Sequence, residues 1–103
     1  MIQVHVDLAV DPAKEQEMLR YFQSEFRPAA MKFTGYVDVR MLKLVATPVG
    51  TAPPGINYRF AIVYENEELR QKWVASPIHI EVWGGMERML SSPDYTVLQF
   101  DAV

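Results

Sequence analysis

The chain has 103 residues, half of them apolar and 22% charged, and its net charge is −3. This composition is typical of a folded globular protein with a single domain, residues 1–103, and argues against disorder. The sequence has no cysteine and no basic stripe, which excludes thiolate chemistry and disfavours binding to nucleic acid or an anionic membrane. No stretch approaches the roughly 20 apolar residues of a membrane span, and the N-terminus lacks the basic region of a signal peptide, so we expect a soluble cytoplasmic protein.

The first third of the chain predicts a strand followed by a helix. Apolar residues from Ile2 to Val10 alternate with polar ones, which is the period of a strand with two unlike faces. Asp11 and Pro12 are typical of a helix start, and apolar residues then recur at three- and four-residue steps. We expect Pro28 to break or bend this helix near Arg27.

Three further strands and a second helix are predicted downstream. We expect strands at Tyr36 to Val45, Asn57 to Glu65 and Tyr95 to Asp101, where β-branched and aromatic residues are frequent. Residues 46–56 contain three prolines and two glycines, which predicts a long loop. Asn66 is a suitable cap for the second helix.

The stretch from Trp73 to Trp83 predicts two helices joined by a kink. The Ser76–Pro77 step can start a new helix, because serine can cap it and proline has no N–H to satisfy in the first turn. His79 and Trp83 are four residues apart and share a helix face. The pair Gly84–Gly85 follows, and each glycine costs roughly 1 kcal/mol in a helix interior, so we expect fraying or a bend there.

The order βαββαβ predicts an α+β, ferredoxin-like fold, with a four-stranded antiparallel sheet and both helices on one face. The other face should collect the polar sides of the strands, namely Gln3, His5, Asp7, Arg40, Asn57, Arg59, Gln99 and Asp101, mixed with Ala9, Leu42, Ala61 and Val63. A face that met only water would be polar throughout, and a core face would be apolar. The mixture favours packing on a second copy, so we expect a homodimer that forms a dimeric α+β barrel.

Several segments resemble one known family. They are Val10-Asp11-Pro12-Ala13-Lys14-Glu15 after the opening strand, Ala61-Ile62-Val63-Tyr64-Glu65-Asn66-Glu67-Glu68, Trp73 followed by Ser76-Pro77-Ile78-His79, and the closing Thr96-Val97-Leu98-Gln99-Phe100. Through these segments the whole chain resembles the antibiotic biosynthesis monooxygenase-like domains of the dimeric α+β barrel superfamily. The resemblance implies the fold, dimerisation and three kinds of relative: cofactor-free quinone-forming monooxygenases, haem-degrading monooxygenases, and stress-associated barrels with no assigned reaction.

The haem-degrading relatives use an Asn on the first strand, a Trp on the second helix and a His beyond it as the iron ligand. Trp73 matches that tryptophan in kind. The first strand, however, offers His5 and Asp7 in place of Asn, and Trp83 falls nearer than His79 to the ligand position. The comparison disfavours haem, although a kink that brings His79 inward would keep haem degradation as a less favoured alternative. No acidic or histidine group has convincing metal-ligand spacing, so we expect neither cofactor nor metal.

The function we expect is a cofactor-independent monooxygenase acting on a small aromatic or quinol-type substrate. Such chemistry needs a base for proton abstraction and positive or hydrogen-bonding groups for the oxyanion. The catalytic candidates are His5, Asp7 and His79. The candidate substrate-binding residues are Arg40, Tyr58, Arg59, Trp73 and Trp83.

These candidates also have structural interpretations. His5 and Asp7 suit a solvated pair, Trp73 suits a core between helix and sheet, and the arginines suit ion pairs with Asp38 or Asp101. The alternative function is a non-catalytic dimeric barrel that binds a small ligand or serves as a stress-associated interaction module. A closed pocket that holds His5 or His79 beside arginine or tyrosine favours the enzyme.

Overall fold

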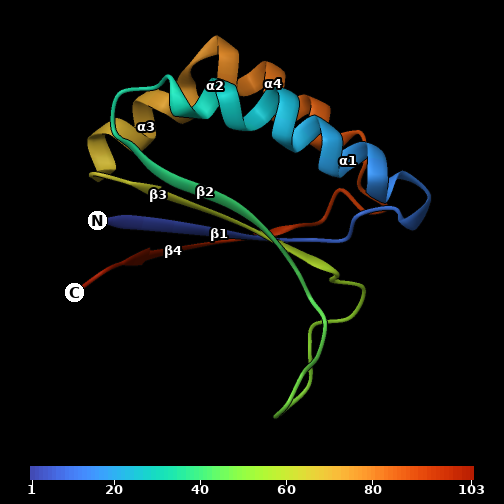
Figure 1. Cartoon of the computed structure of the whole chain (residues 1–103). Coiled ribbons are helices and arrows are strands. Elements are labelled where there is room, and N and C mark those ends of the chain that lie inside the picture. Colours follow the sequence, from blue (N-terminus) through green and yellow to red (C-terminus); the bar gives the residue numbers. More distant parts are fainter.

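A computed structural model describes all 103 residues. Its strands are β1 (Ile2–Leu8), β2 (Tyr36–Lys43), β3 (Tyr58–Tyr64) and β4 (Thr96–Asp101). They form one antiparallel sheet in the order β2-β3-β1-β4, and the helices all cover one face of it (Figure 1). The α+β, ferredoxin-like fold predicted from the sequence is therefore confirmed. The connection between β2 and β3, residues 44–57, projects past the sheet on the side away from the helices (Figure 1).

The first helical region follows β1 as one continuous run of turns. It comprises a 3-10 turn η1 (Pro12–Lys14), α1 (Glu15–Tyr21), a π-helical turn η2 (Phe22–Phe26) and α2 (Arg27–Met31). Asp11 caps its start by accepting a hydrogen bond from the Ala13 N–H at 3.0 Å. Pro28 does not break the helix, but the regular α-helical geometry is interrupted just before Arg27 by the π-helical turn, in which the Arg27 N–H donates to the Phe22 carbonyl. This wider turn makes room for the proline ring, so the helix continues through α2.

The second helical region is the kinked pair that the sequence predicts. Asn66 caps α3 (Glu67–Ala75) with its side chain. Ser76 is extended at the kink, and its hydroxyl accepts a hydrogen bond from the His79 N–H at 3.3 Å, at the start of α4 (Pro77–Glu87). The kink places His79 in the first turn of α4 against Trp73 of α3, with the ring centroids 5.2 Å apart.

The pair Gly84–Gly85 does not interrupt α4, so the expected fraying is wrong. Tyr21 of α1 lies so close to Gly85 that a Cβ at this position would overlap the tyrosine ring and hydroxyl. The Tyr21 hydroxyl donates a hydrogen bond to the Val82 carbonyl at 3.0 Å. Packing of Tyr21 into the space above Gly85 offsets the low helix propensity of glycine.

The core lies between the helices and the inner face of the sheet. Alternate strand residues point into it and are buried, among them Val4, Val6, Leu8, Phe60 and Ile62. Phe26 packs edge-on against Phe60 and against Trp73, with ring centroids 4.9 and 6.3 Å apart. None of the helices combines the length and the apolar character needed to cross a membrane.

The opposite side of the sheet, called the outer face below, carries Gln3, His5, Asp7, Asp38, Arg40, Leu42, Arg59, Ala61, Val63, Thr96, Leu98 and Phe100. It is mixed in character, but the expected positions of Gln99 and Asp101 on it are wrong. Gln99 pairs with Val4, and directly paired residues share a face, so Gln99 lies on the inner side. Leu98 and Phe100 point outward instead. The outer face is thus more apolar than the sequence indicates.

Candidate functional site

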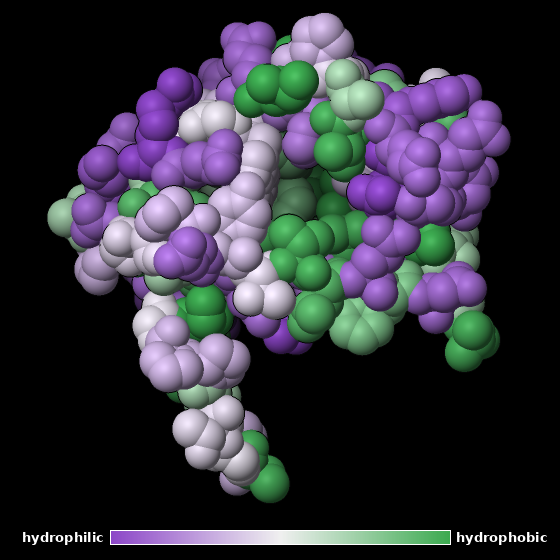
Figure 2. All heavy atoms as spheres, turned by 180° about the vertical axis from the view of Figure 1, so that it is seen from behind, coloured by the Kyte–Doolittle hydropathy of each residue, from purple (hydrophilic) through white to green (hydrophobic).

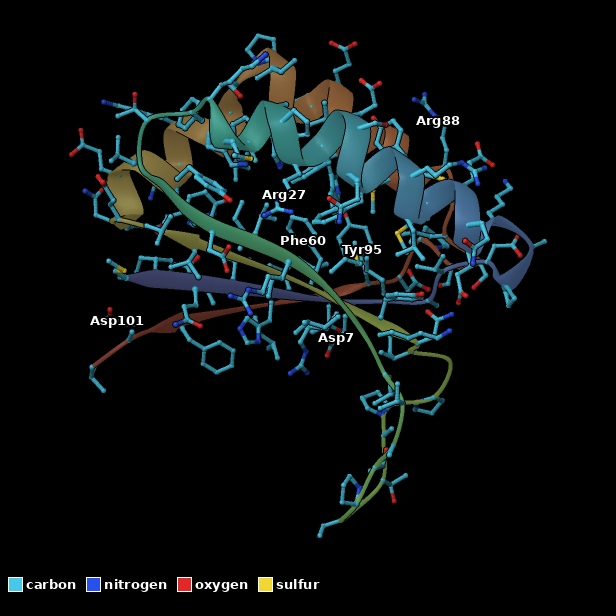
Figure 3. The ribbon with its side chains drawn as sticks, viewed as in Figure 1. Asp7, Arg27, Phe60, Arg88, Tyr95 and Asp101 are labelled. Atoms are coloured by element: carbon cyan, nitrogen blue, oxygen red, sulfur yellow. The ribbon has the colours of Figure 1, made fainter.

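A cavity of about 220 Å³, called the interior pocket below, lies between the inner face of the sheet and helices α3 and α4. Its walls are Val4, Val6, Phe60, Ile62, Tyr64, Arg70, Val74, His79, Trp83, Tyr95 and Val97. Figure 2 views the molecule from behind and shows a hollow with hydrophobic walls. Figure 3 shows Phe60 and Tyr95 in the space between sheet and helices. Apolar walls with a few polar groups are typical of a small-molecule site.

His79 reaches the interior pocket from the first turn of α4, which the Ser76 cap fixes. Its ring stands edge-on to Trp73, and its Nδ1 atom is buried without a hydrogen-bond partner. Burial lowers the pKa of His79 below the ordinary value of 6.5, against a smaller opposing effect of the Val74 backbone. The imidazole is therefore mostly neutral near neutral pH and able to accept a proton.

Trp83 and Tyr95 form the aromatic end of the interior pocket. Trp83 packs on Phe60 and stands edge-on to Tyr95, with ring centroids 5.4 and 5.7 Å apart. The Trp83 Nε1–H donates to the Tyr95 hydroxyl at 3.1 Å, and that hydroxyl donates to the Glu87 carboxylate at 3.1 Å. These hydrogen bonds fix the orientation of both rings, which gives the pocket a rigid aromatic wall.

The opposite end of the interior pocket is polar. Arg70 donates from Nε and Nη2 to the two carboxylate oxygens of Glu67, at 2.7 and 2.6 Å. Gln99 of β4 and Gln71 donate to the same carboxylate at 2.7 and 3.0 Å. The hydrogen bonds from Arg70, Gln71 and Gln99 lower the pKa of Glu67 to about 2, so Glu67 and Arg70 remain a charged pair. Tyr64 lies beside Arg70, and burial raises the pKa of its hydroxyl.

His5 and Asp7 lie on the outer face, so the sheet separates them from the interior pocket. Figure 3 shows Asp7 on the side of the sheet away from the helices. Asp7 accepts two hydrogen bonds from Arg59, at 2.6 Å from Nε and 3.2 Å from Nη2. His5 packs against Phe100, with ring centroids 5.3 Å apart. The structure thus pairs Asp7 with Arg59. It does not bring His5 and Asp7 together with His79.

The other candidates are divided between the core and the outer face. Trp73 is buried in the core and does not line the interior pocket. Arg40 forms an ion pair with Asp38 at 2.7 Å. Tyr58 is buried on the inner side of the sheet, where it pairs with Leu8, and it also borders an open hollow of about 380 Å³ that Asp7 and Arg59 line. Of the residues proposed from the sequence, His79 and Trp83 meet in the interior pocket.

Sequence reasoning missed Tyr64, Arg70 and Tyr95. Tyr64 is one of several aromatic residues that alternate along β3, and Arg70 has the spacing of an ordinary helix-surface partner for Glu67. The alternation along the strand could have indicated Tyr64, because it places the tyrosine on the core face, where its hydroxyl needs a hydrogen-bond partner.

The interior pocket does not fit haem. Its volume of about 220 Å³ is below the range of about 300–1,000 Å³ that holds drug-sized ligands, and haem is at least as large as these ligands. No three histidine or acidic side chains lie close enough together to hold a metal ion.

No protein-family model matches the sequence, and no curated protein matches it. Solved structures do match. SnoaB, a cofactor-independent oxygenase from Streptomyces nogalater, has a TM-score of 0.76 at 13% identity, over 98% of this chain and 91% of SnoaB. A protein from Caulobacter crescentus, provisionally named an antibiotic biosynthesis monooxygenase, has a TM-score of 0.76 at 17% identity, over 99% of this chain and 89% of that protein. A dimeric ferredoxin-like protein of unknown function from Jannaschia sp. has a TM-score of 0.78 at 11% identity, over 98% of both chains.

The chain has the fold of these proteins. The resemblance to antibiotic biosynthesis monooxygenase-like domains is thereby confirmed at the level of the fold, which is what identities of 11 to 17% can establish. Activity depends on the site rather than on the fold.

Proposed function

We propose that this protein is a cofactor-independent monooxygenase that oxidises a small aromatic or quinol-type compound in the interior pocket, with His79 as the base. The observation that carries the proposal is the His79 imidazole in the wall of a cavity that Phe60 and Trp83 also line, where burial lowers its pKa. The fold is shared with SnoaB, which is a cofactor-independent oxygenase. The cavity of about 220 Å³ exceeds the roughly 150 Å³ of an apolar cavity that binds benzene, so it suits one or two rings.

The reaction begins when His79 takes a proton from an acidic O–H or C–H group of the substrate. The resulting anion is electron-rich and reacts with dioxygen at a ring carbon. One oxygen atom stays on that carbon as a carbonyl, and the other leaves as water. The substrate supplies all four electrons, so no external reductant is needed. Phe60 and Trp83 hold the ring in place.

The test is conversion of 1-naphthol to 1,4-naphthoquinone by the purified protein. One dioxygen is consumed and one water is formed for each quinone, which an oxygen electrode and absorbance together measure. His79→Gln should lower the rate by about 100-fold, the lower range for loss of a general base. Lys72→Gln, which alters an exposed cation outside the pocket, is the control. An unchanged rate in His79→Gln contradicts the proposal, and loss of the rate in His5→Gln instead would move the chemistry to the outer face.

We also propose that two copies associate through their outer faces. Leu42, Leu98 and Phe100 are between 41% and 50% exposed there. Asp7 pairs with Arg59 within the chain, so the face presents little unbalanced charge to a second copy. The Jannaschia protein of the same fold is dimeric. Burial of these apolar side chains would supply the driving force for association.

A further inference from the structure

The polar end of the interior pocket contains a tyrosine hydroxyl that lacks a partner. Tyr64 is 4% exposed, and its side chain lines the pocket. Burial raises the pKa of this hydroxyl and the charge of Arg70 opposes the rise, while no hydrogen bond contributes. The hydroxyl therefore stays protonated and can donate. A hydroxyl that lines the pocket and makes no hydrogen bond within the chain is free to donate to a ligand bound there.

Arg70 adds donors at the same end. A guanidinium carries five N–H groups, and Glu67 takes one from Nε and one from Nη2. Gln71 and Gln99 hold the Glu67 carboxylate in turn. The positive charge of Arg70 is thus balanced by a fixed carboxylate, while its other N–H groups remain available.

From these contacts we infer that Tyr64 and Arg70 form a subsite for the oxygen of a neutral carbonyl carried by the aromatic ligand. Tyr64 and Arg70 line the same pocket, so a hydroxyl and a guanidinium N–H are both available to the two lone pairs of one carbonyl oxygen. A carboxylate would bring a second negative charge to a site where Glu67 already balances the arginine, so its desolvation would not be repaid. The inference rests on the proposed function only in taking the interior pocket as the ligand site, and it does not require turnover.

The experiment compares three probes that share one ring system: 2-acetylnaphthalene, 2-ethylnaphthalene and 2-naphthoate. The first carries a neutral carbonyl, the second lacks an acceptor, and the third carries a carboxylate. Isothermal titration calorimetry of the purified protein should show the ketone binding about tenfold more tightly than either of the others, as expected when one hydrogen bond is gained. Tyr64→Phe keeps the ring and removes the donor, so it should abolish most of this preference and leave the hydrocarbon affinity unchanged.

Lys72→Gln is the matched control, because Lys72 is a cation on the same helix that pairs with Glu68 and does not line the pocket. It should keep the preference for the ketone. Circular dichroism checks that Tyr64→Phe is folded, and Arg70→Gln provides the same comparison should it unfold. Equal affinity of ketone and hydrocarbon, or an unchanged preference in a folded Tyr64→Phe, overturns the subsite alone.

Absence of binding by all three probes overturns both the subsite and the proposed function. A clear ketone preference in a protein that does not oxidise 1-naphthol supports the subsite and counts against the oxygenase activity. The two proposals can therefore fail separately.

Discussion

The interlock between Tyr21 and Gly85 makes opposite predictions for two adjacent glycines of α4. A Cβ added at Gly84 meets nothing within 4 Å, whereas a Cβ added at Gly85 would overlap the Tyr21 side chain. Gly84→Ala should therefore stabilise the protein by about 1 kcal/mol through helix propensity alone. Gly85→Ala gains the same propensity but forces Tyr21 to move, and overpacking costs typically 1–3 kcal/mol.

Displacement of Tyr21 also breaks its hydrogen bond to the Val82 carbonyl at 3.0 Å, which adds about 1 kcal/mol. The net expectation for Gly85→Ala is a loss of about 1–3 kcal/mol, so the two alanine variants should differ by about 2–4 kcal/mol. Urea unfolding followed by circular dichroism measures both free energies, and the midpoint should shift in opposite directions. Equal stabilisation of the two variants would refute the interlock as the reason that α4 continues through the glycine pair.

Three further outcomes follow from the site and the outer face. Burial lowers the pKa of His79 below 6.5, so as the pH falls the unfolded chain binds this proton before the folded chain does. The free energy of unfolding should therefore decrease as the pH drops from about 6.5 toward the folded pKa. His79→Phe should flatten that part of the pH profile of the free energy of unfolding, measured with urea. Glu67→Gln leaves the charge of Arg70 unbalanced, so calorimetry should show about tenfold tighter binding of 2-naphthoate than in the wild type; an unchanged affinity would mean that Glu67 does not set the preference for a neutral oxygen. Phe100→Glu should convert a dimer to a monomer in light scattering with the circular dichroism spectrum preserved, and a variant that remains dimeric would place the interface elsewhere.

The architecture could be predicted because each element has a local cause. Alternation from Ile2 defines β1, and side-chain caps at Asn66 and Ser76 define the starts of α3 and α4. The errors arise where tertiary contacts decide. Pro28 is tolerated because a π-helical turn precedes it, and Gly85 because Tyr21, distant in sequence, fills the space beside it.

The site was only partly predictable for the same reason. The spacing of His79 and Trp83 indicates a shared helix face, and both line the interior pocket. His5 and Asp7 have an equally plausible spacing, but strand register places them across the sheet from that pocket. The alternation along β3 indicates that Tyr64 faces inward, but its role also depends on the helix residues that line the pocket beside it.

The orientation of Gln99 toward the inner side of the sheet links the polar end of the interior pocket to the proposed dimer. Hydropathy alone predicts that Leu98 and Phe100 face the core and that Gln99 faces solvent. The pairing register of β4 on β1 instead places Gln99 on the inner side and Leu98 and Phe100 on the outer face. Facing inward, Gln99 donates to Glu67 at 2.7 Å and so helps to fix the charged pair at the polar end of the pocket. Facing outward, Leu98 and Phe100 supply the apolar area for a second copy. All six residues of the edge strand β4 are exposed in the monomer, and Leu98 and Phe100 are left in water on its outer side. Dimerisation through the outer face would cover these two side chains and hold β4, with Gln99, in the position that the pocket needs.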